Sequence, residues 1–174
     1  MTNKFTCVFI GRFQPFHTGH MLVVQGMVKV CGKIIIAVCS PSAKQGATDP
    51  FTSSERRDMI QRALQANDII PNADVTFIEI SDQPTDEAWA KMILEQAGGT
   101  VHQVWTGNEW TKKCFEAAGI EVKWIKEVPG ISATEVRKRM AEGGDWKAQV
   151  PEEVASSIIA IDGVDRVKKL AGGV

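Results

Sequence analysis

The feature that most constrains the fold of this chain is a regular alternation of short β-branched runs with longer helical segments. The runs are rich in Val, Ile, Phe and Trp, which is typical of strands. They lie at residues 5–10, 33–39, 75–80, 101–106 and 121–125. The segments between them predict helices at 19–31, 53–66, 86–97 and 109–118. This alternation predicts an α/β protein with a parallel sheet, right-handed crossovers and helices on both faces.

After the fifth predicted strand the pattern becomes helical only. Helices are expected at 132–142, 151–161 and 164–171, the last two as a hairpin. No composition shift or linker divides the 174 residues, a length typical of one domain. We therefore expect a single domain over 1–174, with an α/β core at 1–130 and a small helical C-terminal segment at 131–174.

Composition excludes several classes of function. Lys and Arg total 20 against 21 Asp and Glu, a balance that argues against bulk binding to nucleic acid or an anionic membrane. No apolar run approaches the roughly 20 residues of a membrane span, and the N-terminus does not resemble a signal peptide. We therefore expect a cytoplasmic protein.

The four cysteines show no metal-binding or redox spacing. Cys7, Cys31, Cys39 and Cys114 form no CxxC pair, and three of them lie inside apolar runs. We expect buried, reduced thiols at all four positions, without a disulfide or a zinc site.

Charge is distributed unevenly along the chain. The first acidic residue is Asp49, and five basic residues precede it: Lys4, Arg12, Lys29, Lys33 and Lys44. This asymmetry arises either by chance or because the N-terminal part of the chain builds an anion site.

Residues 11–20, Gly-Arg-Phe-Gln-Pro-Phe-His-Thr-Gly-His, follow the first predicted strand. Ligands bind beyond the carboxyl ends of strands in such sheets. If a helix starts near Thr18, His17 and His20 lie on the same side of its first turn, where free N–H groups favour phosphate. Gly19 permits close approach and Arg12 adds a cation. The alternative is an ordinary N-cap with two surface histidines. Neither a P-loop nor a GxGxxG motif follows a strand.

Two segments resemble the signatures of the HxGH nucleotidylyl transferases. Residues 17–20, His-Thr-Gly-His, are similar to the HxGH signature, and residues 130–137, Gly-Ile-Ser-Ala-Thr-Glu-Val-Arg, are similar to ISxTxxR. Further segments resemble the archaeal-type nicotinamide-nucleotide (NMN) adenylyltransferases. They are 11–20, 49–56 (Asp-Pro-Phe-Thr-Ser-Ser-Glu-Arg), 106–108 (Thr-Gly-Asn), 134–140 and 144–146 with Pro151. The resemblance covers nearly the whole chain and implies a Rossmann-like fold and the synthesis of NAD and pyrophosphate from ATP and nicotinamide mononucleotide.

The resemblance also implies a set of site residues. The expected catalytic residues are His17, His20, Arg12 and Arg137. The expected ATP-binding residues are Gly11, Gly19, Gly107, Asn108, Ser132 and Thr134. The expected NMN-binding residues are Trp89, Asp86 and Phe13. Trp89 is the candidate stacking partner for nicotinamide, against the alternative that it is a core residue. The other four tryptophans, Trp105, Trp110, Trp124 and Trp146, are expected to pack.

Two positions depart from the family pattern. Thr48 stands where a basic residue is expected, with Lys44 as the candidate replacement, and Asp86 stands where an Asn is expected. Relatives form hexamers, so a homo-oligomer is expected.

The implied chemistry agrees with these residue types. The nucleophile is a phosphate monoester, largely dianionic at neutral pH, so it needs no general base. The protein must align two polyanions and stabilise charge on the transferring phosphoryl group, which calls for cations and N–H donors. Mg²⁺ is expected to be carried by the ATP phosphates, without protein metal ligands. The alternatives are another HxGH adenylyltransferase, acting on FMN or phosphopantetheine, and a non-catalytic nucleotide-sensing module.

Overall fold

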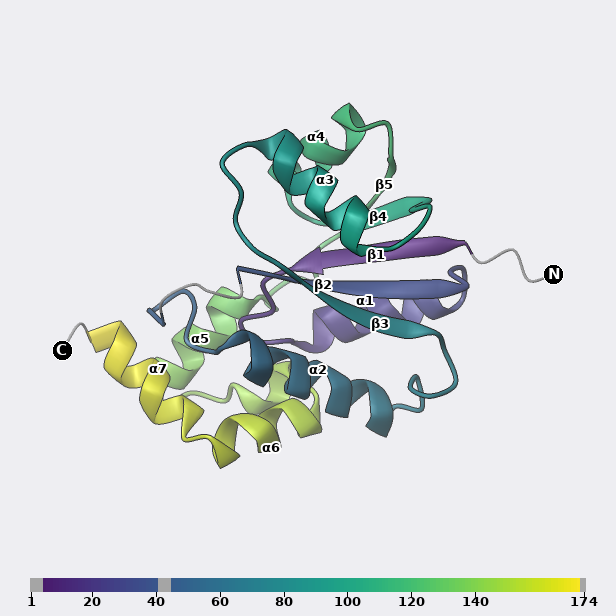
Figure 1. Cartoon of the computed structure of the whole chain (residues 1–174). Helices are drawn as coiled ribbons and strands as arrows, with labels where there is room; N and C mark the ends of the chain where they lie inside the picture. Colours follow the sequence, from purple (N-terminus) through teal and green to yellow (C-terminus); the bar gives the residue numbers. More distant parts are fainter. Residues whose placement is uncertain (1–4, 41–44, 173–174) are drawn as a thin grey trace.

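A computed structural model describes residues 5–40 and 45–172 of the chain. Its centre is a five-stranded parallel sheet in the order β3-β2-β1-β4-β5 (Figure 1). The strands are β1 (Thr6–Gly11), β2 (Lys33–Cys39), β3 (Val75–Ile80), β4 (Gln103–Thr106) and β5 (Glu121–Trp124). The expected α/β class and parallel sheet are confirmed, with strand ends displaced by two residues at most.

Four helices connect the strands and cover both faces of the sheet. Helices α1 (Thr18–Val28) and α2 (Ser53–Ala66) lie on one face, and α3 (Asp86–Gln96) and α4 (Glu109–Ala117) lie on the other (Figure 1). The face changes because the chain leaves β1 toward β2 and β3, then returns past β1 to β4 and β5. Right-handed crossovers in opposite directions place their helices on opposite faces. Each face has its own buried apolar cluster.

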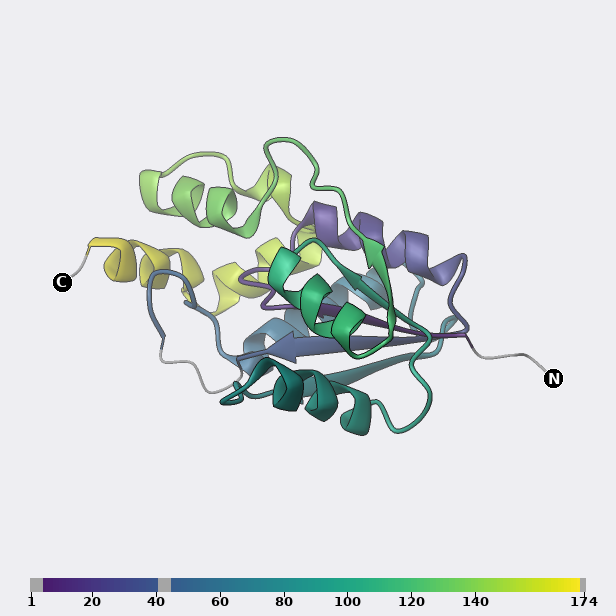
Figure 2. The same cartoon turned by 90° about the horizontal axis from the view of Figure 1, so that it is seen from above.

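The C-terminal helices lie on the α1–α2 face. They are α5 (Ala133–Glu142), α6 (Glu152–Ala160) and α7 (Gly163–Gly172), with a short 3-10 turn, Lys147–Gln149, before α6. Val136 of α5, Ile158 of α6 and Val167 of α7 belong to the same apolar cluster as α1 and α2. Helices α5 and α7 lie beside the carboxyl ends of the strands (Figure 2), so α5 can contribute to a site at that edge.

The expectation that all four cysteines are reduced thiols is wrong for two of them. Cys7 of β1 and Cys31 form a disulfide, with 6.0 Å between their Cα atoms, while Cys39 and Cys114 are free and buried. The pairing follows from the crossover, because the turn after α1 returns to the start of β1. The Gly32 N–H donates to the Phe5 carbonyl (2.9 Å), which brings the two cysteines together. A separation of 24 residues gives no local signal of this pairing.

Of the basic residues among the first 48, the three that the structure describes do not form one anion site. Lys29 caps the C-terminus of α1 and Lys33 begins β2, so both lie at the amino ends of the strands. Arg12 lies at the carboxyl ends, and Lys4 and Lys44 are outside the described residues. The charge asymmetry of the sequence is therefore not a spatial cluster among Lys29, Lys33 and Arg12. In the described part of the chain, no helix is long and apolar enough to span a membrane.

Candidate active site

Two cavities open at the carboxyl end of β1, where the crossovers change direction between β1 and β4. Parallel sheets bind ligands at such a switch point. The tryptophan cavity, of about 360 Å³, is lined by Ile10, Gly11, Arg12, Cys39, Ser40, Asp82, Gln83, Trp89, Asn108, Trp110 and Thr111. The histidine cavity, of about 280 Å³, is lined by Phe9, Ile10, His17, Gly19, His20, Val23, Thr106, Gly107, Asn108, Ile125, Lys126, Glu127, Val128, Ile131 and Ser132. Ile10 and Asn108 line both cavities, so the two form one cleft across the end of β1.

His17 and His20 cap the start of α1 reciprocally. The His20 N–H donates to Nδ1 of His17 (3.3 Å), and the His17 N–H donates to Nδ1 of His20 (3.2 Å). The two rings stack with centroids 3.5 Å apart. Because each Nδ1 accepts a hydrogen bond, each neutral imidazole carries its proton on Nε2. The expected placement of both histidines on one side of the first turn is confirmed, and the N-cap residue is His17.

Burial keeps both imidazoles neutral. It lowers the pKa of His17 to about 4. The pKa of His20 lies well below its usual value, mainly because of burial and secondly because of the adjacent His17. At neutral pH the pair therefore presents two Nε2–H donors to the cavity rather than two cations.

A second helix N-terminus borders the histidine cavity. Ser132 is the N-cap of α5, and its hydroxyl accepts from the Glu135 N–H (3.1 Å). Arg137, one turn later, donates to the Gln14 carbonyl (2.8 Å) and to the Thr134 hydroxyl (3.4 Å). Arg137 and Thr134 line neither cavity, and these contacts join α5 to the loop after β1.

Two expected ATP-binding glycines line the histidine cavity and are also required by packing. A Cβ on Gly19 would lie 3.0 Å from the His17 ring, and a Cβ on Gly107 would lie 3.2 Å from the Ile125 carbonyl oxygen. A side chain at either position would displace cavity walls. Gly11, also expected to bind ATP, lines the tryptophan cavity instead.

Arg12, which lines the tryptophan cavity, and the nearby Arg56, which does not, have different environments. The Arg12 side chain is 57% exposed and donates to both carboxylate oxygens of Asp49 (3.2 Å each). Arg56 is 1% exposed and donates to the carbonyls of Arg12 (2.6 Å), Cys39 (2.8 Å) and Ser40 (3.1 Å). Burial lowers the pKa of Arg56. Its three bonds to carbonyls hold the ends of β1 and β2 together. Sequence analysis did not single out Arg56, although it ends the 49–56 motif.

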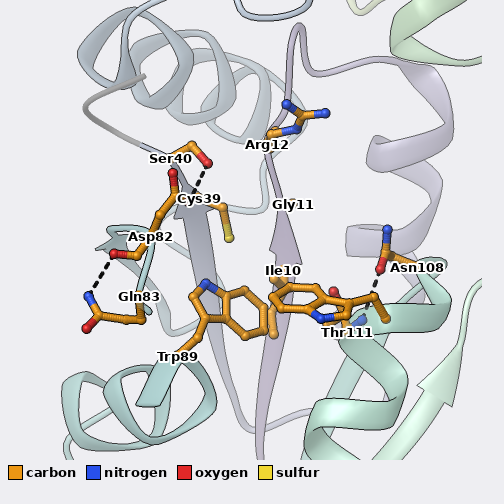
Figure 3. Close-up of a pocket in the computed structure, with 11 residues that line it drawn as sticks. Ile10, Gly11, Arg12, Cys39, Ser40, Asp82, Gln83, Trp89, Asn108 and Thr111 are labelled. Atoms are coloured by element: carbon orange, nitrogen blue, oxygen red, sulfur yellow. Dashed lines mark hydrogen bonds between the residues drawn. The ribbon is translucent and has the colours of Figure 1, made fainter. Parts of the chain in front are cut away.

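Two indoles form one wall of the tryptophan cavity (Figure 3). The Trp89 ring is 5% exposed, and its centroid lies 4.7 Å from that of Trp110 at an interplanar angle of 47°. Trp89 also meets Phe115 edge to face at 5.9 Å. Trp89 is thus both a core residue and a cavity residue, and the two interpretations of its role are compatible.

The expectation that the other four tryptophans are packing residues is wrong for two of them. Trp110 is 44% exposed and lines the cavity, because it follows the N-cap Asn108 by two residues. Trp124 is also 44% exposed, with the Lys112 ammonium 5.7 Å from its ring centroid. Trp146 is buried and Trp105 is half-buried, as packing residues are.

Two residues expected to bind NMN lie away from both cavities. The Phe13 side chain is buried against the rings of Phe9 and His20. Asp86 is exposed at the first turn of α3 and lines a hollow on the outer side of α3 and α4. The corresponding polar groups in the cavity are Asp82 and Gln83, which sequence analysis missed. Their position directly after the strand β3 could have indicated them, because ligands bind beyond the carboxyl ends of parallel strands.

The described residues contain no cluster of three potential metal ligands. In the ranges 5–40 and 45–172, no three His, Cys, Asp or Glu side chains lie together as a metal site requires.

The chain matches a known protein family over most of its length. The model of the cytidylyltransferase-like family matches residues 8–139. The nicotinamide-nucleotide adenylyltransferase of Thermococcus kodakarensis is 35% identical over 94% of this chain and 87% of its own. That of Methanococcus maripaludis (strain C6) is 34% identical over 93% of each chain.

Solved structures agree in fold. A bifunctional NMN adenylyltransferase/ADP ribose pyrophosphatase from Francisella tularensis superimposes with a TM-score of 0.80 at 20% identity, over 96% of this chain and 52% of that chain. The chain thus spans about half of that bifunctional protein. Its complex with AMP and a manganese ion gives a TM-score of 0.70 at 24% identity, over 83% of this chain and 44% of that chain.

Proposed function

The chain belongs to the cytidylyltransferase-like family and to its nicotinamide-nucleotide adenylyltransferases, and we propose that it joins the adenylyl group of ATP to nicotinamide mononucleotide. The products are NAD and pyrophosphate. The observation that carries the proposal is the cleft at the end of β1. One half of it offers neutral N–H donors to phosphates, and the other half offers aromatic surface to a base. Family membership agrees with the resemblance found in the sequence.

The reaction is a phosphoryl substitution that leaves few tasks to acid–base groups. An oxygen of the mononucleotide phosphate forms a bond to the α-phosphorus of ATP, and the bond from that phosphorus to the β-phosphate bridging oxygen breaks. Pyrophosphate leaves with the electron pair. Positioning and charge stabilisation therefore supply most of the rate enhancement.

The histidine cavity supplies the donors that such a step requires. The Nε2–H groups of His17 and His20 and the N-termini of α1 and α5 border one small space. Because burial keeps the imidazoles neutral, their donation does not depend on protonation near pH 7. We assign the ATP phosphates to this cavity, with His20 as the main transition-state donor. Arg137, which lines neither cavity, holds α5 against the loop after β1 by donating to the Gln14 carbonyl.

The tryptophan cavity suits the mononucleotide. The indoles that line it offer aromatic surface to the nicotinamide ring. Arg12 at the rim can exchange its Asp49 partner for the mononucleotide phosphate. Asn108 lines both cavities and is held by its bond to the Thr111 N–H (2.9 Å), so it can contact both substrates.

We propose that Mg²⁺ enters this site bound to the phosphates of ATP. A divalent ion on the phosphates neutralises their charge and stabilises the leaving pyrophosphate. The Francisella tularensis protein in complex with AMP contains a manganese ion, which is consistent with a divalent requirement.

We also propose that the chain acts as a cytoplasmic homo-oligomer. Exposed apolar side chains lie on and directly after α1, with Leu22 and Val30 more than half exposed. Sedimentation of the purified protein tests this: a mass equal to one chain would contradict it.

The decisive assay for the reaction uses purified protein, ATP and Mg²⁺ with each candidate acceptor in turn. Products are identified by mass. We expect NAD and pyrophosphate from nicotinamide mononucleotide. Turnover of FMN or phosphopantetheine in its place would assign another adenylyltransferase, and ATP binding without any product would favour a nucleotide sensor.

A further inference from the structure

The aromatic surface open to a ligand in the tryptophan cavity belongs mainly to Trp110. Trp89 is 5% exposed, because Trp110 and Phe115 cover its ring on two sides, whereas Trp110 is 44% exposed. The indoles of Trp89 and Trp110, here called the shelf, have ring centroids 4.7 Å apart. Figure 3 shows the Trp89 indole beside Ile10 at the cavity wall. We therefore expect a planar ring in this cavity to contact Trp110 more than Trp89.

A carboxylate borders the same cavity. Asp82 is exposed and accepts a hydrogen bond from the Ser40 hydroxyl (3.0 Å), which holds it at the cavity wall opposite Asn108 (Figure 3). Within the described residues Asp82 forms no ion pair. Among the described residues of the lining, the other charged side chain, Arg12, is bound by Asp49. The described lining of the cavity thus combines aromatic faces with a carboxylate that has no ion-pair partner among the described residues.

This combination selects cations. A cationic ring is attracted to the face of an indole and to a carboxylate, and the attraction grows as water is excluded. An anionic substituent on that ring meets like charge at Asp82, and like-charge juxtaposition is a common means of excluding a competitor.

We propose that Trp110 and Asp82 are specificity-determining residues, which make the cavity select a pyridinium ring bearing an uncharged substituent. The inference rests on the proposed function and extends it. The preferred acceptor is the amide, nicotinamide mononucleotide, and the acid, nicotinate mononucleotide, is disfavoured. Trp110 is presented to the ring by the Asn108 cap of α4, and Asp82 is presented by Ser40.

The first test changes Trp110 beside a matched control. Trp110→Ala should raise KM for nicotinamide mononucleotide about ten- to a hundredfold, the range that base stacking represents, with KM for ATP nearly constant. Trp110→Phe should restore most of the loss. Trp124→Ala removes an equally exposed indole that lines neither cavity and should leave both constants unchanged. Melting temperatures of all three variants report whether they are folded.

The second test changes Asp82. Asp82→Asn should lower the ratio of kcat/KM for the amide to kcat/KM for the acid about five- to tenfold, as expected for one partly exposed charge. Glu87→Gln, an exposed carboxylate on α3 outside the cleft, is the control and should leave the ratio unchanged.

The outcomes separate this inference from the function it rests on. If the wild type makes no NAD from either mononucleotide, the proposed function fails. If the wild type does so but folded Trp110→Ala keeps its KM, or Asp82→Asn keeps the amide-to-acid ratio, the inference alone is overturned. A lower melting temperature with equal effects on both substrates would also overturn it, because Trp110 would then be a structural residue.

Discussion

The two halves of the cleft are built in different ways. The histidine cavity depends on residues three positions apart on α1 and on a capped helix start at α5, with backbone bonds that hold each side chain. The tryptophan cavity collects side chains from the ends of three strands and the starts of two helices, several of them exposed. The difference indicates that the donors to phosphate are encoded in two short motifs, although other walls of the histidine cavity come from β1, β4 and the segment after β5. The choice of acceptor is encoded in dispersed positions.

The largest expected effect concerns Trp89, the buried member of the shelf. Trp89→Ala removes an indole from a packed core and should lower the free energy of unfolding by about 3–5 kcal/mol. Trp89→Phe should lose less, because it retains most contacts with Phe115. Chemical denaturation measures both. If Trp89→Ala keeps wild-type stability, the ring is not part of the core and the contrast with Trp110 is lost.

The next effect concerns chemistry in the histidine cavity. His20→Ala removes a preorganised donor and should lower kcat by about 10²–10³, with KM for ATP changed far less. His102→Gln is the control, since the third histidine lies at the amino ends of the strands, where it accepts from the Thr6 N–H. A loss confined to KM would mean that His20 binds ground-state ATP only.

The pH dependence of the free energy of unfolding should report the burial of His17 in the histidine cavity. The pKa of His17 falls from 6.5 unfolded to about 4 in the fold, so the unfolded chain binds its proton first as pH decreases. Stability that is complete above pH 6.5 should therefore be lost between about pH 6.5 and 4, by up to about 3 kcal/mol. Denaturation of the wild type and His17→Asn at several pH values measures this. An equal acid slope in both would refute the assignment.

The smallest expected effect is at the exposed rim. Asp49→Asn breaks the ion pair with Arg12 and frees the guanidinium for phosphate, so KM for nicotinamide mononucleotide should fall about two- to fivefold, a change of less than about 1 kcal/mol. The effect should vanish at high salt. Asp58→Asn, which breaks an exposed pair with Arg62 on α2, is the matched control. A rise in KM would mean that Asp49 positions Arg12 instead of competing for it.

The sequence predicted the fold well because its signals were local. The β-branched runs and the helical segments between them each act within a few residues, and the structure has a strand or helix at each expected place. The histidine pair was predictable for the same reason, since its geometry follows from a spacing of three at a helix start.

What the sequence did not predict depends on contacts between distant segments. The Cys7–Cys31 pairing requires the path of the first crossover, and Arg56 reaches carbonyls of two strands. Trp110 lies only two residues after a motif residue, but its exposure depends on how α3 packs against α4. Composition cannot distinguish a buried tryptophan from one at a cavity wall.

The reciprocal cap at the start of α1 has a consequence for protein engineering. Residues 17–20 hold their own donors in place through bonds within the same turn, so the unit brings its orientation with it. Transplanting this element onto another strand-to-helix joint would also require its surroundings, since the His20 ring packs against Phe9, Phe13 and Phe16 and the Thr18 hydroxyl donates to the Gln149 carbonyl. The tryptophan cavity can be engineered in a different way, because its walls come from separate loops. These walls can be varied one at a time to accept new ring systems, while residues 17–20 stay unchanged.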